Sequence, residues 1–157
     1  MAAPFRAAVD GGSRGNPGPA AWAVAVLDGD GDYVEGFAGA LGPATNNVAE
    51  YHGLLEALRL AEDRGAEDVE IRADSELIVR QMNGGYRVRH PSLIPLWREA
   101  VRLSRGFRTF RIVHVRREDN RAADRLVNRA LDQAADPSAG AARIHDLPEK
   151  TASPERA

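Results

Sequence analysis

A change of hydrophobic period along the chain is the feature that most restricts its fold. Near the N-terminus, short apolar segments alternate with turns rich in glycine, proline and aspartate, which predicts three antiparallel strands. Farther on, apolar residues recur at helical spacing, and helical and strand-like segments then alternate. The expected strands are Phe5–Asp10, Ala20–Leu27, Tyr33–Leu41, Asp68–Ala73 and Phe107–Val115, and the expected helices are Asn46–Arg64, Ser75–Met82, Pro91–Arg105 and Arg121–Ala134.

The element order βββαβααβα predicts an α/β fold with a five-stranded mixed sheet flanked by helices. The length of 157 residues fits one domain with a sizeable core. After residue 135 the composition shifts to alanine, proline, serine and charged residues, with little to bury. We therefore expect a catalytic domain over residues 1–135 and a disordered tail over residues 136–157.

The sequence contains no cysteine, which excludes disulfides, thiolate metal sites and cysteine nucleophiles. No apolar run approaches the length of a membrane span. The first residues lack the long apolar stretch after a basic start that marks a signal peptide. We therefore expect a cytoplasmic protein that does not associate with membranes.

The charge of the chain is unevenly distributed. The formal net charge is −2, which argues against a general nucleic-acid binder. The stretch from Glu76 to Arg117, however, holds ten arginines and only two acidic residues. Such a basic stretch in an acidic chain is typical of a polyanion partner, although a solvated helix face is an equally good interpretation of charge alone.

Four acidic residues occupy positions where a fold would favour apolar side chains. Asp10 and Asp74 end predicted strands, and Glu50 and Asp124 lie beside the apolar sides of predicted helices. A buried, unpaired carboxylate is costly, and divalent cations remove that cost. Oxygen ligands without histidine or cysteine suit Mg²⁺ or Mn²⁺, and a pair of such ions can support phosphodiester hydrolysis.

Each of these acids also has a simpler interpretation. Asp74, next to a serine, could cap the following helix, and Asp10 could begin an ordinary turn. Glu50 could lie on an exposed helix rim, and Asp124 could pair with a neighbouring arginine. The metal interpretation requires that all four converge, which periodicity cannot show.

Together these residues resemble the type I ribonuclease H family. The resemblance is carried by the motifs VDGGSRGNPGP at Val9–Pro19, TNNVAEY at Thr45–Tyr51, ADS at Ala73–Ser75 and REDNRAAD at Arg117–Asp124. It covers roughly residues 5–134, and the predicted element order is that of the family's ribonuclease H-like fold.

The resemblance implies an endonuclease that hydrolyses the RNA strand of RNA–DNA hybrids and leaves 5′-phosphate products. It maps the catalytic and metal-binding acids, for two Mg²⁺ ions that Mn²⁺ can replace, onto Asp10, Glu50, Asp74 and Asp124. We also expect a monomer.

The resemblance further implies contacts with the hybrid. The substrate-binding residues expected from it are Gly11, Gly12, Ser13, Asn16, Thr45, Asn46, Asn47, Tyr86, Arg87, Arg89 and Arg117. Within this set Asn46 is expected to read a ribose 2′-hydroxyl and Thr45 to hold a DNA phosphate. An enzyme indifferent to sequence should read hydroxyls, phosphates and groove shape in this way.

The chain departs from the family pattern in two places. The basic protrusion is reduced to Asn83–Ser92, where Tyr86, Arg87 and Arg89 form a shorter version, so weaker and strongly salt-dependent binding is expected. The flexible-loop histidine before the last acid is absent, and Arg117 or Glu118 could replace it. Some members of this compact form also cleave double-stranded RNA.

Two other functions therefore remain open beside hybrid cleavage. One is a nuclease of the same fold that prefers double-stranded RNA. The other is a hybrid-binding module without catalytic activity, against which the intact set of four acids argues.

Overall fold

The computed structural model describes residues 3–136, 138 and 143–149. The strands are β1 (Phe5–Ser13), β2 (Gly18–Leu27), β3 (Tyr33–Ala44), β4 (Asp68–Ala73), β5 (Thr109–His114) and β6 (Arg143–Asp146). The helices are α1 (Asn46–Asp63), α2 (Glu76–Met82), α3 (Ile94–Ser104) and α4 (Arg121–Ala135), with a 3₁₀ turn at Arg117–Asp119. The predicted α/β class and the element order up to α4 are confirmed.

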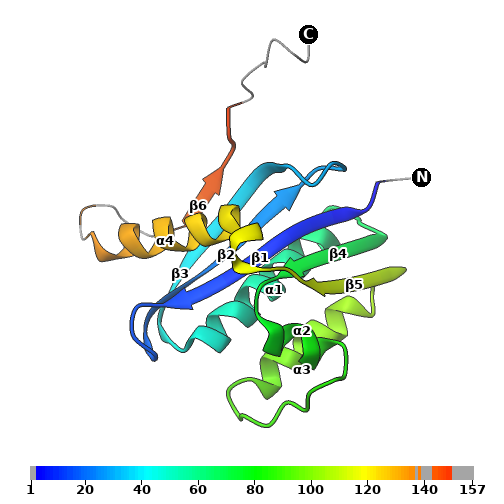
Figure 1. The fold of residues 1–157 in the computed structure, drawn as a ribbon, viewed down its shortest axis with the longest axis horizontal. Coiled ribbons are helices and arrows are strands. Elements are labelled where there is room, and N and C mark those ends of the chain that lie inside the picture. The colour runs from blue at the N-terminus through cyan, green and yellow to red at the C-terminus, as the bar shows by residue number, and fades with distance from the viewer. Residues whose placement is uncertain (1–2, 137, 139–142, 150–157) are drawn as a thin grey trace.

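One mixed sheet, in the order β5-β4-β1-β2-β3-β6, separates two layers of helices (Figure 1). Strands β1, β2 and β3 form an antiparallel meander, and β4 and β5 continue the sheet in parallel from β1. Helix α1, with α2 and α3 beside it, packs on one face, and α4 packs on the other. No helix in the described part is long and apolar enough to cross a membrane.

Strand β2 shows why the two faces take different helices. Its larger side chains, including Trp22 and Val24, belong to the core shared with α1. Its alternate residues Ala21, Ala23 and Ala25 face α4 and are fully buried. A row of methyl groups lets α4 lie close to the sheet, which brings the start of that helix near the end of β1.

The prediction of five strands is wrong by one, because β6 pairs antiparallel with β3, from Gly36 opposite Asp146 to Gly39 opposite Arg143. The expected disordered tail therefore contains an ordered strand at residues 143–146. The remaining parts of that prediction, at residues 137, 139–142 and 150–157, lie outside the described residues.

Side chains on both sides of the sheet hold β6 in place. Ile144 is 5% exposed within the α4 core. On the other side, the His145 ring stacks on Phe37 with centroids 4.6 Å apart. Asp146 accepts hydrogen bonds from Tyr33 and from Arg129. A four-residue strand with one aliphatic side chain has too little alternation to recognise from sequence, because its partners come from β3 and α4.

The predicted turn at Gly11–Pro19 is also corrected. Strand β1 continues to Ser13, and its last residues pair with the beginning of β2, so the connecting turn is shorter than predicted. Glycine inside a strand often marks the close approach of another backbone, and Gly11 marks such an approach, described below.

We expect Ile144→Ala to lower the unfolding free energy by about 2 kcal/mol and the melting temperature by about 4–8 °C. The loss follows from the cavity left between β6 and α4. Thermal unfolding followed by circular dichroism measures it. Leu147→Ala is the matched control because Leu147 is 66% exposed. Equal melting temperatures for the two variants would show that β6 contributes nothing to the core.

Candidate active site

The four predicted acids line one cleft of about 590 Å³. Asp10 projects from β1 and Glu50 from α1, while Asp74 follows the last residue of β4. Asp124 lies in the first turn of α4. The structure therefore brings together four carboxylates that are far apart in the sequence, at the edge where the parallel strands β1 and β4 end.

A direct backbone contact fixes Asp10 relative to Glu50. A Cβ on Gly11 would lie 2.2 Å from the carbonyl carbon of Ala49, and a Cβ on Gly53 would lie 2.6 Å from the carbonyl oxygen of Asp10. Only glycine at these two positions allows β1 and α1 to approach so closely. The residues beside the contact, Asp10 and Glu50, are carried into the cleft together.

The fourth acid is placed by a buried asparagine. Asn120 is 2% exposed, and its Nδ2 donates to the carbonyl oxygen of Val9 at 3.0 Å. The backbone carbonyl oxygen of Asn120 accepts a hydrogen bond from the first-turn amide of Asp124 at 3.1 Å. Asn120 thus ties the start of α4 to the residue before Asp10. No role for Asn120 was predicted from the sequence.

The capping role considered for Asp74 belongs to its neighbour. Ser75 Oγ accepts from the amide of Ile78 at 3.3 Å and caps α2. Asp74 is therefore left to face the cleft. Within the described residues, no ion pair joins Asp124 to Arg121 or Arg125, so the simpler interpretation of that acid also fails.

Two of the carboxylates in the cleft, Asp10 and Glu50, are poorly solvated and lie near the charges of other acids. Burial raises the pKa of Asp10 from 3.8 to about 8, and the nearby charges of Asp74, Asp124 and Glu50 add to the rise, against the hydrogen bond from the Gly11 amide. Burial, with the charge of Asp74, raises the pKa of Glu50 to about 7, against the effects of Ser75 and Arg117. Glu50 Oε2 is buried without a hydrogen-bond partner in the described part of the chain.

These observations fit a divalent cation. Carboxylates held close together raise one another's pKa until a positive charge compensates them. The unpartnered Glu50 oxygen offers a ligand atom that nothing in the described protein satisfies. The charged ligands that line the cleft are all oxygens, which suits Mg²⁺ or Mn²⁺ rather than zinc.

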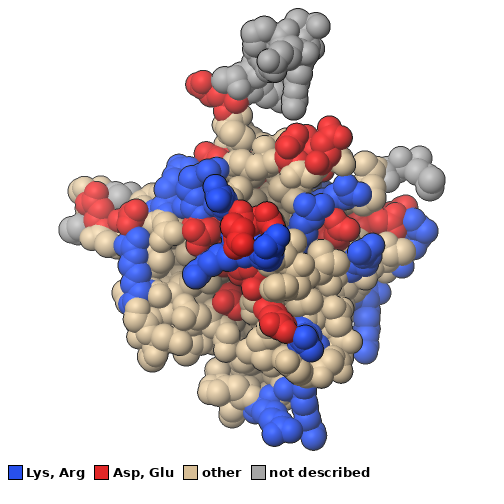
Figure 2. All heavy atoms as spheres, in the orientation of Figure 1, with Lys and Arg blue, Asp and Glu red and all other residues tan. Residues whose placement is uncertain are grey.

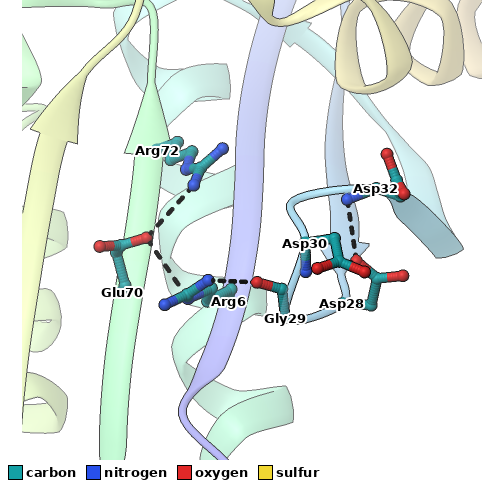
Figure 3. Close-up of polar contacts among 7 residues, drawn as sticks. All are labelled: Arg6, Asp28, Gly29, Asp30, Asp32, Glu70 and Arg72. Atoms are coloured by element: carbon teal, nitrogen blue, oxygen red, sulfur yellow. Dashed lines mark hydrogen bonds and ion pairs between the residues drawn. The ribbon is translucent and has the colours of Figure 1, made fainter.

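A second acidic group lies in the turn between β2 and β3 and has a structural explanation. Asp28, Asp30 and Asp32 bring one oxygen each within 4.8 Å of one another. Asp28 Oδ1 accepts the amides of Asp30 at 2.9 Å and Asp32 at 3.0 Å, which closes the turn (Figure 3). Arg6 bonds the carbonyl of Gly29 beside it. None of these three aspartates lines the cleft.

The expected substrate-binding residues divide into two groups. Those that line the cleft are Gly11, Gly12, Ser13, Asn46 and Arg117. Those that do not are Asn16, Thr45, Asn47, Tyr86, Arg87 and Arg89. Of the two candidates to replace the loop histidine, Arg117 reaches the cleft and Glu118 does not.

Hydrogen bonds join several of these residues at the start of α1. Asn46 Oδ1 accepts from the amide of Ser13 at 2.8 Å and from its hydroxyl at 3.1 Å. Asn16 Oδ1 accepts the amide of Asn46 at 3.1 Å. Thr45 caps the helix by accepting from Val48 at 3.2 Å. The turn after β1 and the first turn of α1 thus form one polar wall.

Sequence reasoning missed part of the lining. The additional lining residues are Arg14, Ser75, Val127, Asn128 and Leu131. Asn128 and Leu131 follow Asp124 at helical spacing and were recoverable from periodicity. Arg14 directly follows β1 and also lines the cleft.

Comparison with known proteins places this site in a family. A family model described as reverse transcriptase-like matches residues 8–130. A ribonuclease HI of Halobacterium salinarum is 45% identical over 125 residues, which are 80% of this chain and 63% of that protein. The chain belongs to the type I ribonuclease H family. The crystal structure of the Halobacterium salinarum RNase H1 gives a TM-score of 0.79 at 43% identity, covering 83% of this chain and 98% of that one.

A second ribonuclease H structure contains nucleic acid. LC11-RNase H1, isolated from compost by a metagenomic approach and solved in complex with an RNA/DNA hybrid, matches with a TM-score of 0.79 at 39% identity, over 84% of this chain and 99% of that one. The chain spans less than two thirds of the curated relatives it matches. It covers 36% of a bifunctional protein of Mycobacterium tuberculosis that is 45% identical over 131 residues.

The structure agrees with the compact form of the ribonuclease H family. The connection between α2 and α3 is short, and Tyr86, Arg87 and Arg89 are exposed on it. The guanidinium of Arg80 lies over the Tyr86 ring, 5.1 Å from its centroid. Basic side chains project from the lower end of the molecule in Figure 2, where this connection lies.

Proposed function

We propose that this chain is a metal-dependent endoribonuclease that hydrolyses the RNA strand of RNA–DNA hybrids and leaves 5′-phosphate products. The observation that carries the proposal is the convergence of Asp10, Glu50, Asp74 and Asp124 on one cleft, with one Glu50 oxygen buried and unpartnered. The hybrid bound by LC11-RNase H1 supports the choice of substrate. A monomeric state and a cytoplasmic location belong to the same proposal.

The four acids would hold two Mg²⁺ ions, which Mn²⁺ could replace. Such ions, when bound, stabilise the attacking and leaving oxygens of a phosphodiester during hydrolysis. The protein's part is to fix the ligands: the β1–α1 contact holds Asp10 and Glu50, and Asn120 holds the start of the helix that carries Asp124.

Polar groups at the start of α1 suit recognition of a sugar–phosphate backbone. Because Asn46 Oδ1 is occupied by Ser13, its amide NH₂ is the group available to donate to a ribose 2′-hydroxyl. Thr45 keeps its hydroxyl proton for a DNA phosphate while its oxygen caps α1. Asn16 and Asn47 flank these two residues. Such contacts read backbone chemistry and leave the base edges unread.

Arginines in and near the cleft offset the negative charge of the four acids. Arg117 lines the cleft and lowers the pKa of Glu50. Tyr86, Arg87 and Arg89 form a smaller basic surface on the α2–α3 connection, outside the cleft lining. Hybrid binding through such contacts should weaken as salt concentration rises, with a slope that grows with the number of phosphates contacted.

Digestion of three labelled substrates of one sequence tests the proposal: an RNA–DNA hybrid, an RNA duplex and a DNA duplex. We expect the RNA strand of the hybrid to be cut internally, with 5′-phosphate ends, in Mg²⁺ and in Mn²⁺, and no cleavage in EDTA. Faster cutting of the RNA duplex would favour the double-stranded RNA nuclease. Hybrid binding without cleavage at any metal concentration would favour a binding module.

A further inference from the structure

An ion pair joins the turn after β1 to α4. Arg14 begins the turn after β1 and lines the cleft, and its Nη2 lies 2.6 Å from Oδ1 of Asp132 near the end of α4. The Arg14 amide donates to the carbonyl of Pro19 at 2.9 Å, so the backbone of the turn is fixed while the side chain reaches across. In Figure 1 this turn lies beneath the C-terminal half of α4.

The position of Arg14 suits a phosphate better than a carboxylate on the protein surface. Arg14 and Arg117 are the basic residues that line a cleft otherwise dominated by four acids. A nucleic-acid strand seated there is repelled by the acids unless cations compensate them. Arginine binds phosphate through charge-assisted, often bidentate hydrogen bonds.

The pair with Asp132 is easily exchanged. The Arg14 side chain is 46% exposed and that of Asp132 is 70% exposed. Exposed pairs of this kind contribute only about 0–1 kcal/mol, so a phosphate can displace Asp132 at little cost.

We propose that Arg14 binds a backbone phosphate of the strand that occupies the cleft, and that Asp132 competes with this phosphate for Arg14. The proposal rests on the proposed function, because it assumes that a nucleic-acid strand enters the cleft. It adds a residue that holds substrate and a residue that limits affinity. If the pair served only as a structural clamp between the turn and α4, loss of the Asp132 charge would weaken hybrid binding instead of tightening it.

Binding of a fluorescent RNA–DNA hybrid, measured by anisotropy with Mg²⁺ in an Asp10→Asn background, tests it. Arg14→Ala should weaken binding by about tenfold. It should also lower the dependence of log K on log salt by about one. Asp132→Asn should tighten binding by about threefold, through removal of the competitor. The double variant should bind like Arg14→Ala alone.

The pair between Arg64 and Glu35 provides matched controls. Its N–O distance is also 2.6 Å, the Arg64 side chain is 40% exposed, and it joins the end of α1 to β3 outside the cleft lining. Arg64→Ala and Glu35→Gln change charge equally and should leave the affinity as it is. Melting temperatures confirm that each variant is folded.

The outcomes separate the two proposals. If Arg14→Ala lowers the affinity for the hybrid no more than Arg64→Ala does, the proposed role of Arg14 is wrong. The proposed function is unaffected by that result. Weaker binding in Asp132→Asn shows a structural clamp and overturns the competition. A parent protein that neither binds nor cuts hybrid removes the proposed function itself.

Discussion

Asp10→Asn is expected to lower the rate of RNA-strand cleavage by about 10³-fold or more, because the loss of one charged ligand removes several kcal/mol of transition-state stabilisation. The asparagine keeps the shape of the side chain, so the fold should remain. Single-turnover cleavage of a labelled hybrid measures the rate, and circular dichroism checks the structure.

Asp30→Asn is the matched control for this substitution. Asp30 is an exposed aspartate of the β2–β3 turn and lies in the other acidic group. It should leave the cleavage rate unchanged. Comparable losses in both variants would mean that total acidity, or a cation at the turn, matters more than the cleft. Full activity in Asp10→Asn would remove the catalytic assignment.

Asp10→Asn should also change how the stability of the protein depends on pH when EDTA is present. The folded protein holds a proton on Asp10 up to a pKa of about 8, against an ordinary value of 3.8, so the folded state binds this proton more tightly than the unfolded state. Stability from this group is therefore full below about pH 4 and declines as pH rises towards 8. The melting temperature should fall between pH 5 and pH 8, and Asp10→Asn should flatten the fall.

Gly11→Ala is expected to destabilise the protein by more than about 3 kcal/mol, a fall of roughly 6–12 °C or more in melting temperature. The added Cβ would lie 2.2 Å from the carbonyl carbon of Ala49 and 2.4 Å from the amide nitrogen of Glu50, which are backbone atoms that cannot rotate away. Separation of β1 from α1 would relieve the clash and would also move Glu50 away from Asp10. Chemical denaturation measures the loss.

Gly12→Ala, one residue later, is the matched control for stability. Its Cβ would meet Val127 Cγ1 at 3.7 Å and Asn46 Oδ1 at 3.9 Å, which are ordinary contacts. It should therefore unfold within about 1 kcal/mol of the parent protein. If both glycines tolerated alanine equally, the close contact between β1 and α1 would not be what holds the two acids together.

The sequence predicted the fold wherever a segment carried its own pattern. The apolar run of β2 between two turns and the helical spacing in α1 are local and strong, so both elements are where they were expected. Strand β6 was missed because Ile144 alone cannot establish a period, and its burial depends on α4. The extension of β1 through Gly11 was missed because glycine signals a turn unless the helix backbone beside it is known.

The candidate site was likewise predicted in part from the sequence. The identities of the four acids followed from their positions and motifs, whereas their convergence required the structure. Asn120 could not be recognised, because its role depends on a hydrogen bond to Val9, which is 111 residues away in sequence. Arg14 likewise gained its significance from a partner 118 residues distant.

Because β1 and α1 touch at Gly11 and Gly53, direct backbone contact sets the spacing between the backbones that carry Asp10 and Glu50. Asp124 is held differently, by the Asn120 hydrogen bond and by side-chain packing of α4 on the alanines of β2. A variant selected for a cation of larger ionic radius should therefore carry its changes under α4. The helix can shift there by fractions of an ångström, while the backbone contact between β1 and α1 at Gly11 and Gly53 is unchanged.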